Sequence, residues 1–225
     1  MTRAAFLVGD SHASNHIVSV HAAFKGSYEV RFATVGHGCG FTVAGGVPNI
    51  PRCAQLHALI MQGLRDHLKA GDLLFTSAHS AWGAAFNSPA NHEAFLGTIA
   101  TLAKSRGAHL VLLGDTPSVR AGHTCVTSAG RYETMCDQPA NRALLSSYSG
   151  ARSFDEMYAR VALAHAPNAH AVRLVHLFCD QAATCGASIP GTHTIGIGDD
   201  SHLTLEGSMY VAPFLACFLE GKGLL

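Results

Sequence analysis

The amino-acid sequence predicts an α/β fold, a three-layer α/β/α sandwich around a five-stranded parallel sheet. Short, nearly continuously apolar runs alternate with segments that carry helical spacing, and this alternation is typical of a parallel sheet covered by helices. The chain has 225 residues, a length that suits one α/β domain. Hydrophobic residues make up 48% and charged residues only 13%, a composition that argues against disorder.

Five short apolar runs are the predicted strands: Ala4–Val8, Tyr28–Thr34, Leu73–Thr76, His109–Leu113 and Ala171–Leu177. Because each run is almost continuously apolar, we expect helices to cover both faces of the sheet. We expect the strand order 2-1-3-4-5, which is the flavodoxin-like arrangement.

Helical spacing marks five further segments: Ala13–Phe24, Cys53–Leu68, Asn91–Arg106, Ser153–His165 and Thr204–Glu220. Ser153 followed by Glu156 is a capping-box pattern, which predicts Ser153 as the N-cap of the fourth helix. Gly221 is suited to end the last helix, and Pro213 is expected to bend it. No linker or repeat interrupts the pattern, so we expect a single domain over residues 1–225.

Three connections are too long for plain turns: Val35–Arg52, Asp115–Gln138 and Phe178–Ser201. Long connections of this kind in compact domains are usually functional. In open α/β sheets, pockets form outside the carboxyl ends of the strands, where such loops lie. We therefore expect these loops to build a ligand pocket.

Six of the seven cysteines form three local pairs associated with these loops, Cys39 with Cys53, Cys125 with Cys136, and Cys179 with Cys185. Three disulfides would each stabilise the fold by roughly 2–4 kcal/mol and would imply an oxidising compartment. The alternative is seven unrelated buried thiols in a reducing cytosol. The absence of a Cys-x-x-Cys motif weakens zinc and redox interpretations, and Cys217 is expected in the core beside Phe214 and Phe218.

The first predicted strand ends in Gly9-Asp10-Ser11-His12, directly before a helix. A serine at such a turn is exposed at the top of the sheet, and its N–H lies at a helix N-terminus that can stabilise an oxyanion. The hydroxyl needs a base to act as a nucleophile. The simpler interpretations are that Ser11 is only a helix cap, and that Asp10 either caps the helix or orients the Ser11 turn.

A base for Ser11 is found near the other end of the chain, in Asp199-Asp200-Ser201-His202 before the last helix. Asp199 is three residues ahead of His202, close enough within a turn to bind one ring nitrogen. The other nitrogen is then available to take the proton of Ser11. These are the roles of a Ser-His-Asp triad, in the chain order Ser, Asp, His.

With these two motifs the sequence resembles the SGNH (GDSL-like) hydrolase superfamily. It is most similar to the SGNH domains appended to membrane O-acetyltransferases of the acyltransferase-3 family. Those domains likewise have Gly-Asp-Ser-His, carry extracytoplasmic cysteine pairs, and continue after the triad histidine as in His202-Leu203-Thr204 of this chain. The resemblance implies the SGNH hydrolase fold and an extracytoplasmic location, whether periplasmic, lumenal or secreted, as a soluble part of a membrane-associated protein.

The resemblance also implies an oxyanion hole formed by Ser11 and a glycine after the second strand. Gly38 is favoured, with Gly36 and Gly40 as alternatives. The superfamily's Gly-x-Asn-Asp block after the third strand is absent, and Ser77-Ala78-His79-Ser80-Ala81-Trp82 stands in its place. The candidates for the missing Asn donor are Ser77, His79 and Asn87. Trp82 and His79 are expected to contact the substrate.

The implied activity is serine-dependent acyl-ester chemistry through an acyl-enzyme, either an O-acetyltransferase or an acetylesterase acting on carbohydrate O-acetyl groups. Water as acceptor gives the esterase and a sugar hydroxyl gives the transferase. Bulky Trp82 and Phe86 favour a small acyl group. Loss of the Asn block keeps one alternative open, a noncatalytic carbohydrate-binding domain.

No cofactor or metal is expected. His12 and His16 have the spacing of two metal ligands on a helix, but the glutamate of His-Glu-x-x-His is missing. Fifteen basic and fifteen acidic residues balance, which gives no basic surface for nucleic acid. The chain has no apolar run long enough to span a membrane, so the expected partners are an ester substrate and a membrane acyl-donor domain.

Overall fold

A computed structural model describes residues 3–24, 26–35, 39, 41, 51–79, 89–117, 119, 148–179, 185–199 and 201–225. Five parallel strands form one sheet in the order β2-β1-β3-β4-β5, as predicted. The strands are β1 (Ala4–Gly9), β2 (Glu29–Thr34), β3 (Leu73–Ser77), β4 (His109–Leu113) and β5 (Ala169–Val172).

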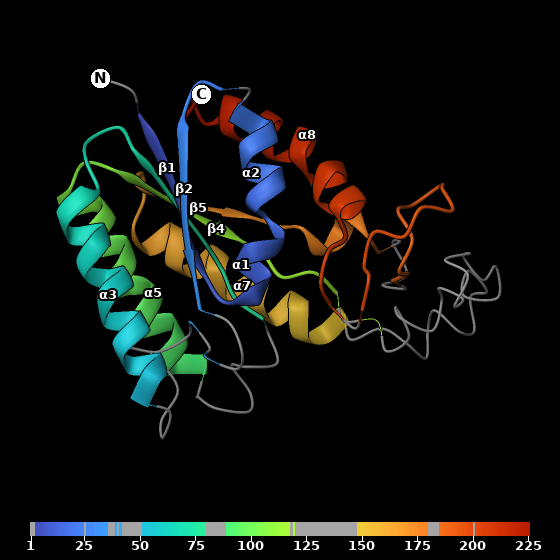
Figure 1. The fold of residues 1–225 in the computed structure, drawn as a ribbon, viewed down its shortest axis with the longest axis horizontal. Coiled ribbons are helices and arrows are strands. Elements are labelled where there is room, and N and C mark those ends of the chain that lie inside the picture. The colour runs from blue at the N-terminus through green and yellow to red at the C-terminus, as the bar shows by residue number, and fades with distance from the viewer. Residues whose placement is uncertain are drawn as a thin grey trace.

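Helices lie on both sides of this sheet (Figure 1). They are α1 (Ser11–Asn15), α2 (Ile17–Phe24), α3 (Pro51–His67), α5 (Pro89–Ser105), α7 (Tyr148–Ala164) and α8 (Leu205–Gly221), with a short 3-10 turn η3 (Val175–Leu177). Because side chains alternate along a strand, Phe6 and Val8 of β1 pack with the layer of α3, α5 and α7. Ala5 and Leu7 pack with the layer of α2 and α8. The three-layer α/β/α fold is confirmed.

The edge strand β2 departs from the expectation that both faces of every strand are covered. The residues of β1 and β3 are buried throughout, whereas β2 is largely exposed and Phe32 retains 60% of its surface. Arg31 of β2 pairs with Glu29 and lies over the ring of Phe6. Charged side chains of this kind are suited to an edge that has no neighbouring strand.

Most predicted bounds lie within two residues of the observed ones, and three elements depart further. The first helix is divided at His16 into α1 and α2. The fourth begins at Tyr148, so Ser153 lies inside α7 and is not its N-cap; an Arg152–Glu156 ion pair spans a turn there. The fifth strand ends at Val172, where its partner β4 also ends, and Val175–Leu177 forms η3 instead.

Two of the three expected disulfides lie within the described residues, Cys39–Cys53 and Cys179–Cys185. Cys125 and Cys136 lie outside them. Cys217 is a free thiol, as expected, but its placement in the core was wrong, because α8 buries Val211, Leu215 and Leu219 and turns Cys217 outward. No helix in the described ranges is long and apolar enough to cross a membrane.

Candidate active site

The turn after β1 depends on Gly9. This residue has a positive φ of 156°, and a Cβ here would overlap the carbonyl oxygen of Ser77 and approach Ala13. Only glycine therefore allows β1 to pass this close to the end of β3 and turn directly into α1. The turn places Ser11 at the first position of α1, just beyond the carboxyl end of β1, which lies between β2 and β3 in the sheet.

Asp10 is the N-cap of α1 and also ties the turn to the neighbouring strand. One carboxylate oxygen accepts the backbone N–H of His12 at 2.9 Å, and the other accepts that of His79 after β3, also at 2.9 Å. Burial raises the pKa of Asp10, outweighing His12 and the two backbone hydrogen bonds. Asp10 thus takes both roles considered from sequence, capping the helix and orienting the Ser11 turn.

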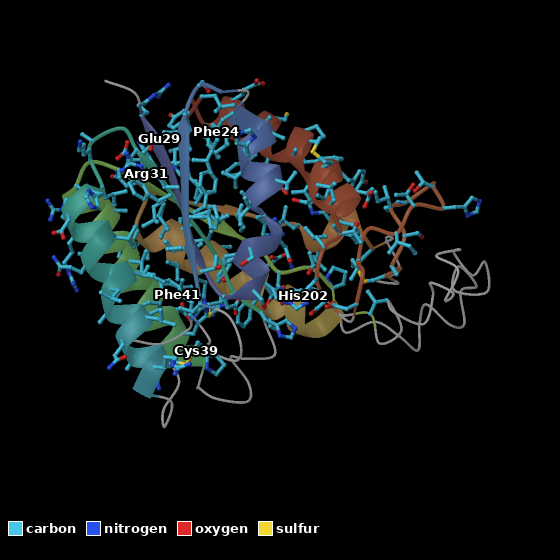
Figure 2. The ribbon with its side chains drawn as sticks, viewed as in Figure 1. Phe24, Glu29, Arg31, Cys39, Phe41 and His202 are labelled. Atoms are coloured by element: carbon cyan, nitrogen blue, oxygen red, sulfur yellow. A yellow bond between two sulfur atoms is a disulfide. The ribbon has the colours of Figure 1, made fainter. Side chains whose placement is uncertain are left out.

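His202 lies against Ser11 although 191 residues separate them. Its Nε2 is 2.9 Å from the Ser11 Oγ, and its Nδ1 is 2.6 Å from Oδ2 of Asp199. With the Nδ1 proton donated to Asp199, the lone pair on Nε2 can accept the Ser11 hydroxyl proton. Figure 2 shows His202 far from Glu29, the first residue of β2, at the opposite end of the sheet. The three residues predicted as a triad are therefore brought together in hydrogen-bond contact.

Asp199 is held by the backbone as well as by the imidazole. Its Oδ1 accepts the N–H groups of Ser201 at 2.8 Å and His202 at 2.7 Å. Partial burial alone would raise the pKa of Asp199, but these two hydrogen bonds, together with the His202 ring, outweigh it and lower the pKa. Asp199 therefore remains ionised at neutral pH and can stabilise a positive charge on His202.

The helices that follow the two motifs are joined by a small polar network. Ser208 of α8 donates from its hydroxyl to the carbonyl of Asn15 at 2.7 Å, and Ser19 of α2 donates to the carbonyl of Ser208 at 2.8 Å. Thr204 caps α8 by accepting the Gly207 N–H. A Cβ at Gly207 would overlap the backbone of Gly196, so glycine allows α8 to pack tightly on the preceding loop.

A second histidine–carboxylate pair lies beside the first, and sequence reasoning missed it. His12 places Nδ1 2.6 Å from Oδ1 of Asp115, which follows β4, and Nε2 3.1 Å from the Oγ of Ser201. Burial disfavours protonation of His12, but Asp115, Asp10 and Asp199 outweigh it and raise its pKa. The position of Asp115 at the carboxyl end of a strand was the available signal, because such positions converge.

His12 and His16, which have the spacing of two metal ligands, lie in different surroundings. His16 is buried, and burial lowers its pKa to about 4, so its ring is neutral at pH 7. Within the described ranges no group of three or more His, Cys, Asp or Glu side chains could hold a metal ion.

The other predicted oxyanion and substrate residues are only partly placed. The His79 ring stacks on His12 with centroids 4.2 Å apart, and burial, aided by the charge of His12, lowers its pKa to about 4. The Ser77 hydroxyl is buried without a hydrogen-bond partner in the described structure. Gly38 and Trp82 lie outside the described residues, as do Gly36, Gly40, Phe86 and Asn87.

A family model described as "SGNH domain (fused to AT3 domains)" matches residues 2–216. None of the curated proteins matches the sequence. Among solved structures, the periplasmic domain of a lipopolysaccharide acetyltransferase from Salmonella ser. Paratyphi A has a TM-score of 0.69 at 14% identity, covering 98% of this chain and 84% of that one.

Two further solved structures share the fold. A GDSL-like lipase from Bacteroides thetaiotaomicron has a TM-score of 0.55 at 15% identity, over 98% of this chain and 88% of the lipase. An acetyl xylan esterase has a TM-score of 0.54 at 11% identity, over 96% of this chain and 99% of the esterase. At these identities the likeness establishes the fold alone.

Proposed function

This chain belongs to the family of SGNH domains fused to AT3 domains, and we propose that it transfers acetyl groups to or from carbohydrate hydroxyls with Ser11 as the nucleophile. The family supports an enzyme of acyl-ester chemistry. The observation that carries the finer proposal is the continuous chain of hydrogen bonds from Ser11 through His202 to Asp199. A nucleophile, a base and an orienting carboxylate in that order are what acyl transfer from an ester requires.

In the first half-reaction the Ser11 Oγ attacks the ester carbonyl carbon while His202 Nε2 takes the hydroxyl proton. The tetrahedral intermediate collapses, the C–O bond to the alcohol breaks, and His202 returns the proton to the departing alkoxide. Ser11 is then an acetyl ester. In the second half, His202 removes the proton of an acceptor hydroxyl and the acceptor oxygen attacks the acetyl carbon. The bond between that carbon and Ser11 Oγ then breaks, and His202 returns the proton to Ser11.

The negative charge of each intermediate needs hydrogen-bond donors. We propose the backbone N–H groups of Ser11 and Gly38, because a donor aimed at a developing oxyanion is worth roughly 10²–10³-fold in rate. For the donor that replaces the family's usual Asn, the candidates are Ser77, the last residue of β3, and His79 and Asn87, which follow it in the sequence. The His79 backbone N–H is already bound to Asp10, so only the ring of this residue could serve.

An open rim at the triad favours a large second substrate. The side chains of His202 and Asp199 are 38% and 51% exposed, so an oligosaccharide can approach the acyl-enzyme from solvent. The named activities of two neighbours, a lipopolysaccharide acetyltransferase and an acetyl xylan esterase, agree with an acetyl group on carbohydrate. We place the chain outside the cytoplasm, supplied with acetyl groups by a membrane AT3 domain.

The first test measures hydrolysis of p-nitrophenyl acetate by the wild type, Ser11→Ala and Ser105→Ala. Ser105 is an exposed serine on α5 whose hydroxyl donates to the Leu102 carbonyl of its own helix, which makes it a matched control. Activity in the wild type and the control, but not in Ser11→Ala, supports the proposal. Equal activity in all three proteins rejects Ser11 as nucleophile, and no activity in any of them favours the noncatalytic binding domain.

The acyl group and its acceptor are tested together. The protein is incubated with acetyl and octanoyl esters in the presence of oligosaccharides, and acetylated sugar is followed by mass spectrometry. We expect acetyl esters to react much faster than octanoyl esters. Acetyl release without acetylated sugar, across a broad panel of acceptors, identifies an esterase, and faster octanoyl cleavage contradicts the small acyl pocket.

The extracytoplasmic location is tested through the cysteines. Non-reducing peptide mapping of freshly isolated protein should recover cross-linked peptides for Cys39–Cys53, Cys125–Cys136 and Cys179–Cys185, with Cys217 alkylatable. Such bridges form and persist mainly in oxidising compartments. Seven alkylatable thiols would contradict both the pairing and the location.

A further inference from the structure

A second Ser-His-Asp chain lies next to the first and interleaves with it. Ser201 Oγ lies 3.1 Å from His12 Nε2, and His12 Nδ1 lies 2.6 Å from Asp115 Oδ1. Each chain takes its serine from one segment and its histidine from the other, because Ser11 precedes His12 and Ser201 precedes His202. The rings of His12 and His202 have centroids only 4.9 Å apart.

Burial separates the roles of the two hydrogen-bonded Ser-His-Asp chains. The side chains of His12 and Asp115 are 2% and 0% exposed, and Ser201 as a residue is 7% exposed. A group so enclosed cannot meet an ester substrate, so the second chain is no second active site. It can act only by fixing the parts of the first chain to which it is bonded.

Ser201 attaches its partly exposed neighbours Asp199 and His202 to the core. All three of its polar groups are engaged. Its N–H donates to Asp199, its carbonyl oxygen accepts the Thr116 hydroxyl at 2.6 Å, and its Oγ binds His12. Asp115 and Thr116, adjacent residues after β4, therefore hold Ser201 twice, once through His12 and once directly.

We propose that His12 is a positioning residue that, braced by Asp115, holds Ser201 and thereby sets the distance between Ser11 and His202. The same bond also restrains Ser11, since His12 is its neighbour in the chain. This inference rests on the proposed function, because the distance matters only if His202 is the base for Ser11. Substrate does not touch His12, so binding should be unaffected while the chemical step slows.

The experiment compares wild type with Ser201→Ala, His12→Asn and the control His57→Asn, using p-nitrophenyl acetate. A displacement of about 1 Å at a catalytic group can cost about 10²-fold in rate, so we expect kcat to fall about 10- to 100-fold in Ser201→Ala and His12→Asn. KM should change less than about twofold, the pattern of a loss confined to the transition state. His57 is a buried histidine of α3 that packs against Phe41 and against Phe95 of α5, and its variant should keep wild-type kinetics.

Ser201→Ala removes one hydroxyl and leaves the His12–Asp115 pair intact, so it should fold even if His12→Asn does not. A second readout needs no activity. Proton NMR of the hydrogen-bonded imidazole N–H groups should show a His202 signal, assigned by its loss in His202→Gln, that shifts or broadens in Ser201→Ala. Wild-type kcat with an unchanged His202 signal in Ser201→Ala overturns the proposal, as does an effect on KM alone. If Ser11→Ala is as active as wild type, the proposed function fails, and the NMR measurement still decides the positioning role.

Discussion

Two histidine–aspartate pairs meet at the carboxyl end of the sheet with the same spacing and opposite surroundings. Nδ1 lies 2.6 Å from a carboxylate oxygen in both the His202–Asp199 and the His12–Asp115 pair. His202 and Asp199 have 38% and 51% of their side-chain surface exposed, whereas His12 and Asp115 have 2% and 0%. The hydrogen bond is therefore the same, and only access to solvent and substrate differs.

The difference shows how one interaction can serve chemistry in one place and structure in another. An exposed pair contributes little to stability, because water screens it, but its imidazole can exchange protons with reacting groups. A buried pair cannot exchange them, and removing one partner leaves the other charged and unsatisfied at a cost of about 3–5 kcal/mol. Activity should therefore depend directly on the exposed pair, and stability on the buried one.

The largest expected effect is on turnover, at the exposed pair and its serine. Ser11→Ala or His202→Ala should lower kcat for acetyl esters by about 10³-fold or more, as loss of a triad member does elsewhere. Asp199→Ala should cost less than either, because it orients the base without exchanging protons itself. Steady-state kinetics on folded variants measures this, and a larger loss in Asp200→Ala than in Asp199→Ala would transfer the role of Asp199 to Asp200.

In equilibrium unfolding we expect the buried pair, not the exposed one, to give the larger effect. Asp115→Ala should lower the free energy of unfolding by about 3–5 kcal/mol, because it leaves His12 buried without its partner. Asp199→Ala should lower it by about 1 kcal/mol or less. Urea titrations followed by circular dichroism give both values, and an equal loss in the two variants would mean that exposure does not distinguish the pairs.

A smaller effect is expected in the pH dependence of stability. Against the effect of burial, the carboxylates of Asp115, Asp10 and Asp199 raise the pKa of His12 above the unfolded value of about 6.5. The stabilisation from the charged ring is then complete below about pH 6.5 and is lost as the pH rises through the folded-state pKa. The pKa of Asp199 is lowered, so its contribution is instead lost as the pH falls through its folded-state value.

This direction of the pH dependence is tested by measuring the free energies of unfolding of wild type and His12→Gln from mildly acidic to alkaline pH. The difference between the two proteins should be largest at mildly acidic pH and should shrink as the pH rises, because the neutral ring has lost its charge interaction. A difference that grows with pH would mean that the buried ring is neutral in the folded protein. The comparison cancels the contributions of titrating groups that do not interact with His12.

Sequence reasoning succeeded where the signal is local. Short apolar runs predicted the five strands, and β4 was placed at His109–Leu113 without error, because a buried parallel strand is apolar along its whole length. Gly9-Asp10-Ser11 and Asp199-x-x-His202 are local motifs too, and the structure brings their side chains into hydrogen-bond contact.

The errors arise where residues far apart in the sequence determine the local structure. Val175–Leu177 is as apolar as a strand, but the sheet ends at Val172 because β4 offers no further partner. His12 and Asp115 are 103 positions apart, and no spacing rule connects them. Their contact follows only from strand order, which brings the ends of β1 and β4 to one edge of the sheet. Contacts of this kind can be identified only once the fold is known.

The most direct test of the central claim is to find where the acetyl group is carried. The wild type is mixed with p-nitrophenyl acetate, quenched in acid and digested with trypsin, which gives one peptide of residues 4–25 containing Ser11 and another of residues 174–222 containing Ser201. Fragmentation by mass spectrometry should locate one acetyl group on Ser11, and Ser11→Ala should carry none. Acetyl on Ser201, or on another residue with Ser11 unmodified, would contradict the assignment of Ser11, His202 and Asp199 as the catalytic residues.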